Sequence, residues 1–342
     1  MDVEFSKILA FDKLALGKTE EEQKVMASYL GIDFEDYRKR IVGKEKEAEF
    51  IYILKALDAL KHFEAYDEEF SHVTDEYTPD FKVELRDGNK MLLEVKHTGK
   101  DYYKISQGNL EKRIAFADRQ QLPLRIAVSI KGMWGLFTTE TLKKHHGKLS
   151  YEDFIGPKSV SWFDSELETC SYMFNKPVKI VSVYSNNHSK GMGIRFDPYG
   201  ELISYKLFYN DRLIFRAKGK DSGYLKFVFI LEALQDRLSI INQNIEQDNN
   251  YTIITEYSNV FQSIPEYNFL ISPVNHIIKD ESRVNYNLRM AISEKSFPLF
   301  TITELRSMFY YLASHGLDIL LLKNNSIYPF LNYANNAWNS SK

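Results

Sequence analysis

The sequence predicts an α/β (α+β) protein in which a mixed sheet flanked by helices is followed by a second α+β domain. Three observations lead to this class. The 342 residues exceed the usual size of one domain, and 44% of them are apolar, enough for more than one core. Between residues 47 and 137 a helical pattern, a hairpin, a second helix and apolar strands follow one another. Beyond residue 150, short strands and helices alternate without repeats.

One cysteine and the lack of long apolar runs in the sequence exclude several classes of protein. Cys170 cannot form an internal disulfide, and a zinc site built on thiolates needs more sulfur. The chain starts with the acidic Met1-Asp2-Val3-Glu4, and the apolar residues 317–322 already include a charge. We therefore expect a soluble, cytoplasmic protein with no membrane partner.

Charge is unevenly distributed behind the formal net charge of −3. Residues 1–92 contain 14 Lys or Arg against 22 Asp or Glu, whereas residues 93–148 contain 11 against 5. A basic segment beside an acidic one suits a protein that binds a polyanion and a divalent cation. Ordinary surface variation produces the same pattern, so charge alone does not decide between the two.

Two helices are predicted before the first strand. Thr19-Glu20-Glu21-Glu22 is a capping box that starts a helix ending near Gly31. A second helix follows Gly43, because apolar residues recur at helical spacing from Phe50 to Leu57. Glu47 lies one turn before Phe50, on the buried side of the first turn, where a carboxylate needs a partner.

A β-hairpin comes next. Residues 81–85 alternate between apolar and polar side chains, residues 87–89 (Asp-Gly-Asn) have turn composition, and residues 90–96 form the second strand. If residues 87–89 are the loop, Lys82 lies opposite Glu94. Asp80 then lies opposite Lys96, and all four side chains share one face. A two-residue loop would put Asp80 and Glu94 on opposite faces.

The rest of the first domain alternates between helix and strand. Residues 106–121 form a helix with Leu110, Ile114 and Ala117 inward and Lys112, Arg113 and Arg119 outside. Residues 124–130 and 134–137 are strands. The clearest break is Gly156-Pro157, so we expect a mixed-sheet domain with an N-terminal helical extension over residues 1–150 and an α+β domain for recognition, assembly or regulation over residues 158–342.

In the second domain, residues 191–219 have the pattern of a three-stranded meander. Residues 224–241 have a helical pattern, residues 242–250 that of a polar loop, and residues 251–271 are rich in strand formers. Thr301-Ile302-Thr303-Glu304 is a second capping box, and its helix ends near Gly316. Residues 317–322 form a buried strand.

The hairpin concentrates chemistry on one face. Glu94 and Lys96 are two apart on a strand, Asp80 begins the partner strand, and Glu47 is a candidate third carboxylate. Carboxylate oxygens suit Mg²⁺, for which Mn²⁺ can substitute, and a metal beside a lysine suits phosphodiester hydrolysis. A plain hairpin with a cross-strand ion pair would contain the same residues.

Pro79-Asp80, Glu94-Val95-Lys96 and an upstream helix with Glu47 resemble the PD-(D/E)XK nuclease superfamily, over about residues 40–140. Residues 46–54 with Pro79-Asp80-Phe81 are most similar to its archaeal Holliday-junction resolvases and restriction endonucleases. The resemblance implies a restriction-endonuclease-like fold. It also implies that Asp80, Glu94 and the Val95 main-chain carbonyl ligate the metal, that Glu47 joins them directly or through water, and that Lys96 is catalytic. DNA contacts are expected from four further residues: Lys100, Lys104, Gln107 and Arg113.

These residues predict a Mg²⁺-dependent endodeoxyribonuclease that acts on double-stranded DNA rather than RNA, as a homodimer or higher assembly. The additional domain favours restriction or anti-phage defence, by analogy at the level of the fold. Three alternatives stay open. One is a structure-specific nuclease for repair or junctions, and another is a nucleic-acid-binding module on a catalytically degenerate nuclease fold. The third is RNA as the substrate, since phosphodiester hydrolysis does not depend on the sugar.

Overall fold

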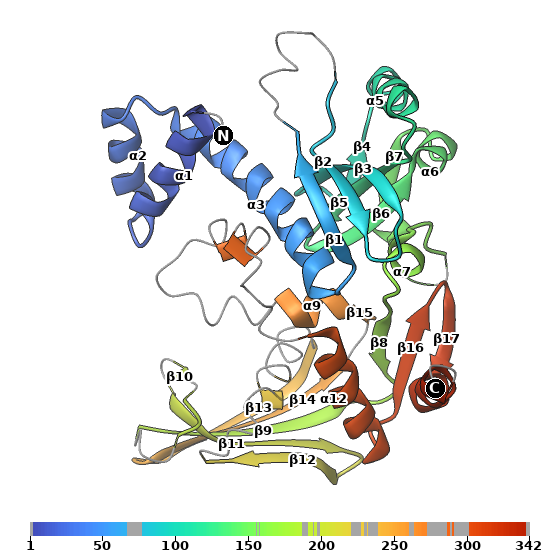
Figure 1. Ribbon diagram of the computed structural model, residues 1–342. Coiled ribbons are helices and arrows are strands. Elements are labelled where there is room, and N and C mark those ends of the chain that lie inside the picture. Colours follow the sequence, from blue (N-terminus) through green and yellow to red (C-terminus); the bar gives the residue numbers. More distant parts are fainter. Residues whose placement is uncertain are drawn as a thin grey trace. The chain divides into compact units, whose positions relative to one another are not determined.

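The computed structural model divides the chain into two compact units (Figure 1). The first consists of Met1–Glu168 with Val274–Pro298, and the second of Thr169–Pro273 with Leu299–Lys342. The residues that the structure describes are 3–66, 77–154, 156, 158–186, 191–193, 195–196, 199–219, 227–228, 231, 239–259, 263–271, 286–287, 289–290 and 301–339. None of the helices described there has the length and apolar character needed to cross a bilayer.

A five-stranded mixed sheet is the centre of the first unit and confirms the predicted fold class. Its strands, in spatial order, are β1 (Leu60–Ala65), β2 (Phe81–Leu85), β3 (Lys90–Thr98), β5 (Leu124–Ile130) and β6 (Met133–Thr138). All neighbours are antiparallel except β3 and β5, which are parallel and connected through helix α5 (Gln107–Gln120). All five strands come from one continuous stretch of chain, and no described strand of the second unit joins them.

Shorter elements complete the unit. They are β4 (Tyr102–Lys104), β7 (Lys148–Ser150), α6 (Thr139–Lys144), the 3₁₀ turn Tyr151–Asp153 and α7 (Phe163–Glu166). β4 and β7 form a two-stranded antiparallel ribbon.

Helices cover both faces of the mixed sheet, because its inner strands are apolar on both sides. On one face, Leu92, Ile126 and Val128 pack with Leu110 and Phe116 of α5. The other face meets α3 (Phe34–Ala56), where the Phe50 and Trp134 rings lie 4.9 Å apart. Since residues alternate along β3, Glu94 and Lys96 point to the α5 face and His97 to the α3 face.

The two amino-terminal helices form a small core with the first turns of α3, which contributes Tyr37 and Ile41. These two helices are α1 (Val3–Ala15) and α2 (Glu20–Tyr29), and the predicted capping box of Thr19 and Glu22 is confirmed. The predicted start of the next helix is wrong: α3 begins at Phe34, where the Asp33 side chain accepts the Asp36 N–H at 2.8 Å, and it continues through Gly43. An exposed glycine with open space around it lowers helix propensity without ending the helix.

The hairpin register differs from the predicted one by two residues. Glu84 lies opposite Lys90 and Lys82 opposite Leu92, rather than opposite Glu94. The turn closes one residue early, because Gly88 adopts a φ of 90° and the Leu85 N–H donates to the Asn89 carbonyl at 2.8 Å. A shift of two conserves the face of every side chain, so Asp80 and Glu94 still share one side of the sheet.

The second unit contains two antiparallel sheets. The larger one comprises β9 (Val178–Ser185), β10 (Arg195–Phe196), β11 (Gly200–Tyr209), β12 (Arg212–Lys218), β13 (Ser239–Gln247) and β14 (Tyr251–Asn259). The smaller one comprises β8 (Ser171–Phe174), β15 (Ile264–Pro265), β16 (Ile319–Lys323) and β17 (Ser326–Pro329). Its helices are α9 (Glu266–Ile271), α12 (Ile302–Ser314) and α13 (Phe330–Asn339).

Most second-unit predictions are confirmed, with two clear exceptions. The expected strands of residues 251–271 end at Pro265, because residues 266–271 form helix α9. The three-stranded meander, the Thr301 capping box and the buried strand after Gly316 are present. The predicted polar loop is wrong: residues 239–247 form strand β13, paired with β14 along its whole length. The main-chain hydrogen bonds of a sheet do not depend on the side chains. The Asn- and Gln-rich residues of β13 can therefore form a strand, because the neighbouring β14 is rich in residues that favour strands. The predicted helix over residues 224–241 therefore loses its last three residues, and most of its remainder lies outside the described residues.

Two glycine substitutions test this account of the fold. Gly147 has a φ of 72°, and an added Cβ would lie 2.2 Å from the carbonyl oxygen of Ile105. The N–H of Ile105 donates to the carbonyl oxygen of Gly147 at 2.8 Å, so the two main chains are held close together. We expect Gly147→Ala to lower the free energy of unfolding by at least about 2 kcal/mol, because main chain must move. In chemical denaturation, Gly43→Ala should instead stabilise α3 by about 0.5–1 kcal/mol. Equal effects of the two changes would contradict the assigned backbone at residue 147.

Candidate active site

Asp80 is held at the start of β2 by the neighbouring strand. Its Oδ2 accepts the main-chain N–H of Val95 at 2.6 Å, and its main-chain carbonyl accepts the N–H of Tyr66 at 3.1 Å. The carboxylate thus accepts the N–H of Val95, which the main chain of a neighbouring strand would otherwise accept. The residue before Asp80, Pro79, has no N–H to donate to a neighbouring strand. Only 7% of the Asp80 side chain is exposed.

Glu94 and Lys96 meet Asp80 from β3. Lys96 Nζ lies 2.7 Å from Glu94 Oε1 and 3.7 Å from Asp80 Oδ2, so one ammonium contacts both carboxylates. Glu94 is 2% exposed, whereas a third of the Lys96 side chain is exposed. The structure therefore brings the three predicted residues together, with the cation as the member nearest to solvent.

Arg113 and Tyr77 complete the surroundings of Glu94. Arg113 donates from Nη2 and Nε to Glu94 Oε1 at 2.7 and 3.2 Å, and the Tyr77 hydroxyl donates to Oε2. The Arg113 guanidinium also lies over the Tyr77 ring, 4.4 Å from its centroid.

The predicted outward position of Arg113 is therefore wrong, since only 16% of its side chain is exposed. Position 113 lies one turn from both Leu110 and Ala117, at the border of the buried helix face, and a long side chain reaches inward from there. Tyr77 was missed by the sequence analysis because it precedes the strand and belongs to no periodic pattern. An aromatic residue directly before Thr78-Pro79-Asp80 was the available signal.

The two carboxylates have opposite electrostatic environments. Burial and the nearby Glu94 charge raise the pKa of Asp80 to about 8, against a partial opposing effect of Lys96. Burial also acts to raise the pKa of Glu94, but Lys96 and Arg113 outweigh it and leave that pKa below its usual value. Burial alone would lower the pKa of Lys96, yet the two carboxylates raise it, so the amine stays an ammonium.

Glu47 approaches from α3 and acts on Asp80 at a distance. Its charge is one of the causes that raise the pKa of Asp80, and its Oε2 accepts a hydrogen bond from Lys44 at 2.9 Å. It lies in the middle of α3 rather than in a first turn, since the helix begins at Phe34. The more deeply buried acid is Glu49, which accepts hydrogen bonds from Trp134 Nε1 and Lys46 Nζ, each at 2.9 Å.

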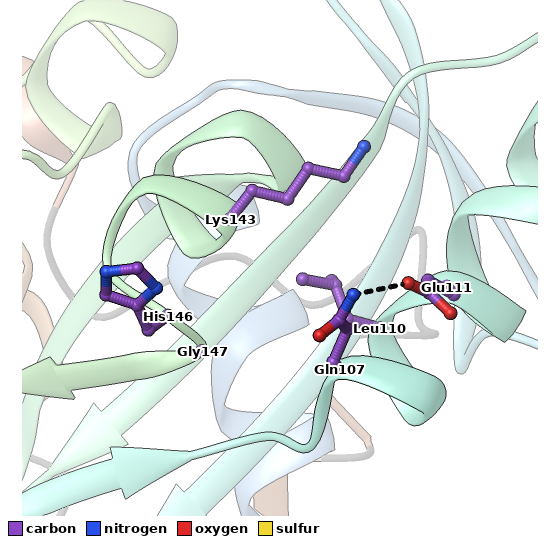
Figure 2. Close-up of a pocket in the computed structure, with 6 residues that line it drawn as sticks. All are labelled: Gln107, Leu110, Glu111, Lys143, His146 and Gly147. Atoms are coloured by element: carbon purple, nitrogen blue, oxygen red, sulfur yellow. Dashed lines mark hydrogen bonds between the residues drawn. The ribbon is translucent and has the colours of Figure 1, made fainter.

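The other predicted DNA contacts lie outside the carboxylate cluster. Lys100 and Lys104 are exposed, beside and on the β4–β7 ribbon. Gln107 starts α5 and lines a pocket of about 310 Å³. Its amide donates to Glu111 Oε1 at 2.8 Å. In Figure 2, Lys143 and His146 reach the same pocket from α6 and the turn after it.

The oxygen donors of the cluster are of the type that a divalent cation such as magnesium prefers. No group of three or more Asp, Glu, His or Cys with metal-binding geometry occurs among the described residues, so two carboxylates, Asp80 and Glu94, are the available pair. Mg²⁺ commonly takes one or two protein carboxylates and fills its remaining positions with water and phosphate oxygens. The raised pKa of Asp80 marks a buried oxygen where added positive charge would be favourable.

The Asp80 pKa generates a testable pH dependence for the metal-free protein. A pKa raised from 3.8 to about 8 means that the folded state holds this proton more tightly than the unfolded state. The resulting stability is complete below about pH 4 and is lost as the pH rises through 8, at up to about 1.4 kcal/mol per pH unit. In EDTA, the wild type should therefore lose stability relative to Asp80→Asn between pH 5 and pH 8. Parallel profiles of unfolding free energy against pH would refute this assignment.

Comparison with known proteins provides little beyond this geometry. No protein-family model matches the chain, and no curated protein is detectably similar to it. Among solved structures, a Holliday junction resolvase from the archaeal hyperthermophile Archaeoglobus fulgidus matches with 15% identity and a TM-score of 0.27. The match covers 32% of this chain and 88% of that one. With a TM-score that low, the chemistry of this chain has to be derived from its own residues.

Proposed function

We propose that the chain is a Mg²⁺-dependent endodeoxyribonuclease of the PD-(D/E)XK type. The observation that supports this most directly is the convergence of two buried carboxylates from adjacent strands on one partly exposed lysine. A surface ion pair would need no burial and no second acid, and it would stabilise the fold by only about 0–1 kcal/mol. The resemblance of Pro79-Asp80 and Glu94-Val95-Lys96 to the nuclease superfamily points the same way.

Each residue of the cluster has a distinct role in this proposal. Asp80 and Glu94, with the Val95 carbonyl, hold the cation, and Glu47 adds negative charge from α3. When bound, Mg²⁺ neutralises the scissile phosphate and lowers the pKa of a water molecule. Lys96 is fixed by Glu94, and its exposed side leaves it able to orient a water or to stabilise charge on the phosphorane. Arg113 keeps Glu94 ionised and correctly placed.

The exposed basic residues of the first unit indicate a polyanionic substrate. The basic segment between residues 93 and 148 includes Lys100 and Lys104 on an exposed surface, as a polyanion requires. We propose double-stranded DNA as the substrate and a role in restriction or anti-phage defence, the latter by analogy with nucleases that have a large additional domain.

One observation favours a second candidate function, a nucleic-acid-binding module without catalysis. Glu94 already accepts hydrogen bonds from Lys96, Arg113 and Tyr77, and a cation would have to displace one of these donors. Metal dependence separates the two functions. An enzyme cleaves only with Mg²⁺ or Mn²⁺, whereas a pure binder retains DNA equally well in EDTA. The decisive experiment incubates the protein with Mg²⁺, Mn²⁺ or EDTA and tests four substrates: supercoiled plasmid, linear duplex, four-way junction and RNA. Cleavage confined to junctions would indicate a repair nuclease.

Lys96→Ala should lower the cleavage rate by about 10²–10³, the usual effect of removing one electrostatic stabiliser of the transition state. The matched control is Lys82→Ala on the adjacent strand. Residue Lys82 lies opposite Leu92, and its ammonium donates to Glu64 at 3.3 Å. Single-turnover rates with Mg²⁺ on plasmid compare the two variants. Equal cleavage rates for the two variants would contradict a role of Lys96 in the chemical step.

Asp80→Ala should abolish cleavage while DNA binding in EDTA is retained or strengthened. The change removes a metal ligand and, above about pH 8, where Asp80 is ionised in the metal-free protein, also a negative charge near the phosphates. At that pH it also relieves repulsion with Glu94, so the thermal midpoint should hold or rise slightly. Glu84→Ala, a change of acid in the middle of the same strand, is the control for both assays. Wild-type cleavage by a folded Asp80→Ala protein would rule out the metal site.

A further inference from the structure

The larger sheet of the second unit has one buried face and one face that is accessible to solvent. On the buried face, Tyr205 and Leu207 are fully buried. The ring centroid of Phe215 on this face lies 5.5 Å from that of Phe227, which in turn lies 5.7 Å from that of Tyr311 on α12. Side chains that alternate with these along the strands point to the opposite face, and most of them are partly or well exposed.

The register of the sheet aligns the side chains of this second face in three rows that cross five strands, from β12 through β11, β9 and β14 to β13 (Figure 1). The rows, each in that strand order, are Leu213, Phe208, Lys179, Tyr257 and Asn242; Arg216, Lys206, Val181, Thr255 and Asn244; and Lys218, Ser204, Val183, Ile253 and Glu246. We call this surface the open face.

Four cations gather in one part of the open face. Arg216 lies directly opposite Lys206, and Lys218 is two residues farther along the strand of Arg216, about 6.6 Å away. Lys179 lies diagonally across from Lys206 on β9. Among the described residues, none of these four side chains forms an ion pair with an acid. Because like charges directly opposite each other destabilise a sheet, a bound anion would stabilise this cluster.

The acidic residues of the sheet do not neutralise the cluster. Glu246 ends the third row at the far edge of the face, where it accepts a hydrogen bond from Asn244 Nδ2 at 2.9 Å. Glu201 lies beyond the third row on β11, is 9% exposed, and accepts the N–H of Gly193 at 2.8 Å. Glu256 points to the buried face. Positive charge is therefore concentrated on the β12 side of the open face.

Aromatic and aliphatic side chains border the cations. The Lys179 ammonium lies 5.2 Å from the centroid of the Phe208 ring and 5.6 Å from that of the Tyr257 ring, so it is held between rings from the two neighbouring strands. Tyr257 is 39% exposed, and Leu213, at the start of the same row, is 46% exposed. A ligand that covers the face has to offer apolar surface as well as negative charge. Nucleotides offer both, in their bases and phosphates.

The apolar side chains favour an unpaired strand over a duplex. Five strands at a spacing of about 4.8 Å span about 19 Å, which is wider than the DNA major groove of about 12 Å, so the face cannot enter a groove. A duplex would reach the cations with its phosphates only and would leave Leu213 and Tyr257 in contact with water. An unpaired strand presents phosphates and base faces together.

We propose that the open face binds an unpaired nucleic-acid strand, with its phosphates on the four cations and its bases against Leu213 and Tyr257. The proposal rests on the proposed function in one respect, that a nucleic acid is the ligand of the chain. It goes further because it assigns to the second unit the recognition of an unpaired segment, which a continuous duplex does not offer. DNA and RNA share this chemistry, so both are tested.

Fluorescence anisotropy of the full chain in EDTA measures binding without cleavage. The probes are labelled oligo(dT) and oligo(U) of about 20 nucleotides and a blunt DNA duplex of the same length. Lys206→Glu should weaken binding of the single strands at least about tenfold, because a cation of the cluster becomes an anion. The fold should be retained, since the introduced carboxylate faces Arg216. The matched control is Lys323→Glu, a change at a partly exposed lysine on β16 of the smaller sheet, which should bind as the wild type does.

Two further variants separate phosphate contacts from base contacts. Lys206→Ala should lower the slope of log Kd against log salt by about 0.7, the value for one phosphate of a single strand. Tyr257→Ser should weaken single-strand binding at least about fivefold and leave this slope and the duplex affinity unchanged. Its control is Tyr328→Ser, a change at a tyrosine on β17 that is 40% exposed. Thermal midpoints confirm that each variant is folded.

Three results would overturn the proposal. The first is equal loss of single-strand affinity in Lys206→Glu and Lys323→Glu. The second is a loss of duplex affinity in Lys206→Glu as large as the loss of single-strand affinity. The third is a wild type that binds neither single strand, which would assign the face to a different anionic partner, such as an acidic protein.

Cleavage assays with Mg²⁺ keep this proposal apart from the nuclease proposal. A protein that binds single strands as expected and cleaves no substrate contradicts the nuclease proposal alone. Mg²⁺-dependent cleavage by a wild type whose single-strand binding is unaffected by Lys206→Glu contradicts the role of the open face alone.

Discussion

The contact of one ammonium group with two buried carboxylates is a constraint that the arrangement of the first unit has to satisfy. Asp80 and Glu94 are almost fully buried, and two unpaired negative charges at such a place would cost several kcal/mol. Lys96 offsets that cost from the same strand as Glu94, and Arg113 adds a second cation from α5. The positions of Lys96 and Arg113 both depend on how the strands and α5 are connected. The even register of the β2–β3 hairpin places Asp80 beside Glu94, and the crossover from β3 to β5 carries α5 over the face where Glu94 points.

The opposite face of the sheet holds a structural counterpart to this cluster. Glu49 is buried there and satisfied by Trp134 and Lys46, which fixes α3 against β6. Glu47, two residues earlier on the same helix, keeps 17% of its side chain exposed and contributes charge to Asp80. One helix thus carries an acid that anchors it in the core and another that acts on the site. Burial alone does not tell their roles apart; their partners do.

The parts predicted from sequence are those determined by local periodicity. Strand parity alone places Asp80, Glu94 and Lys96 on one face, and this survives a register error of two residues because the side-chain period is two. The roles of Arg113 and Tyr77 depend on tertiary contacts across 19 and 17 residues, which no periodic pattern encodes. Strand β13 was missed for a related reason. Its Asn and Gln side chains resemble a loop, and only the neighbouring β14 makes the segment a strand.

The difference between Asp80 and Glu94 also suggests how such a site divides its tasks. Glu94 is surrounded by cationic donors that keep its pKa low, and in the structure it holds the side chains of Lys96 and Arg113. Asp80 has a single N–H donor, a more distant ammonium and two nearby acids, and in the metal-free protein its pKa is raised to about 8. A proton and a divalent cation then compete for the same carboxylate. In the proposed nuclease, Asp80 is therefore the group through which pH would control cation binding, and Glu94 would hold Lys96 in place before the cation binds.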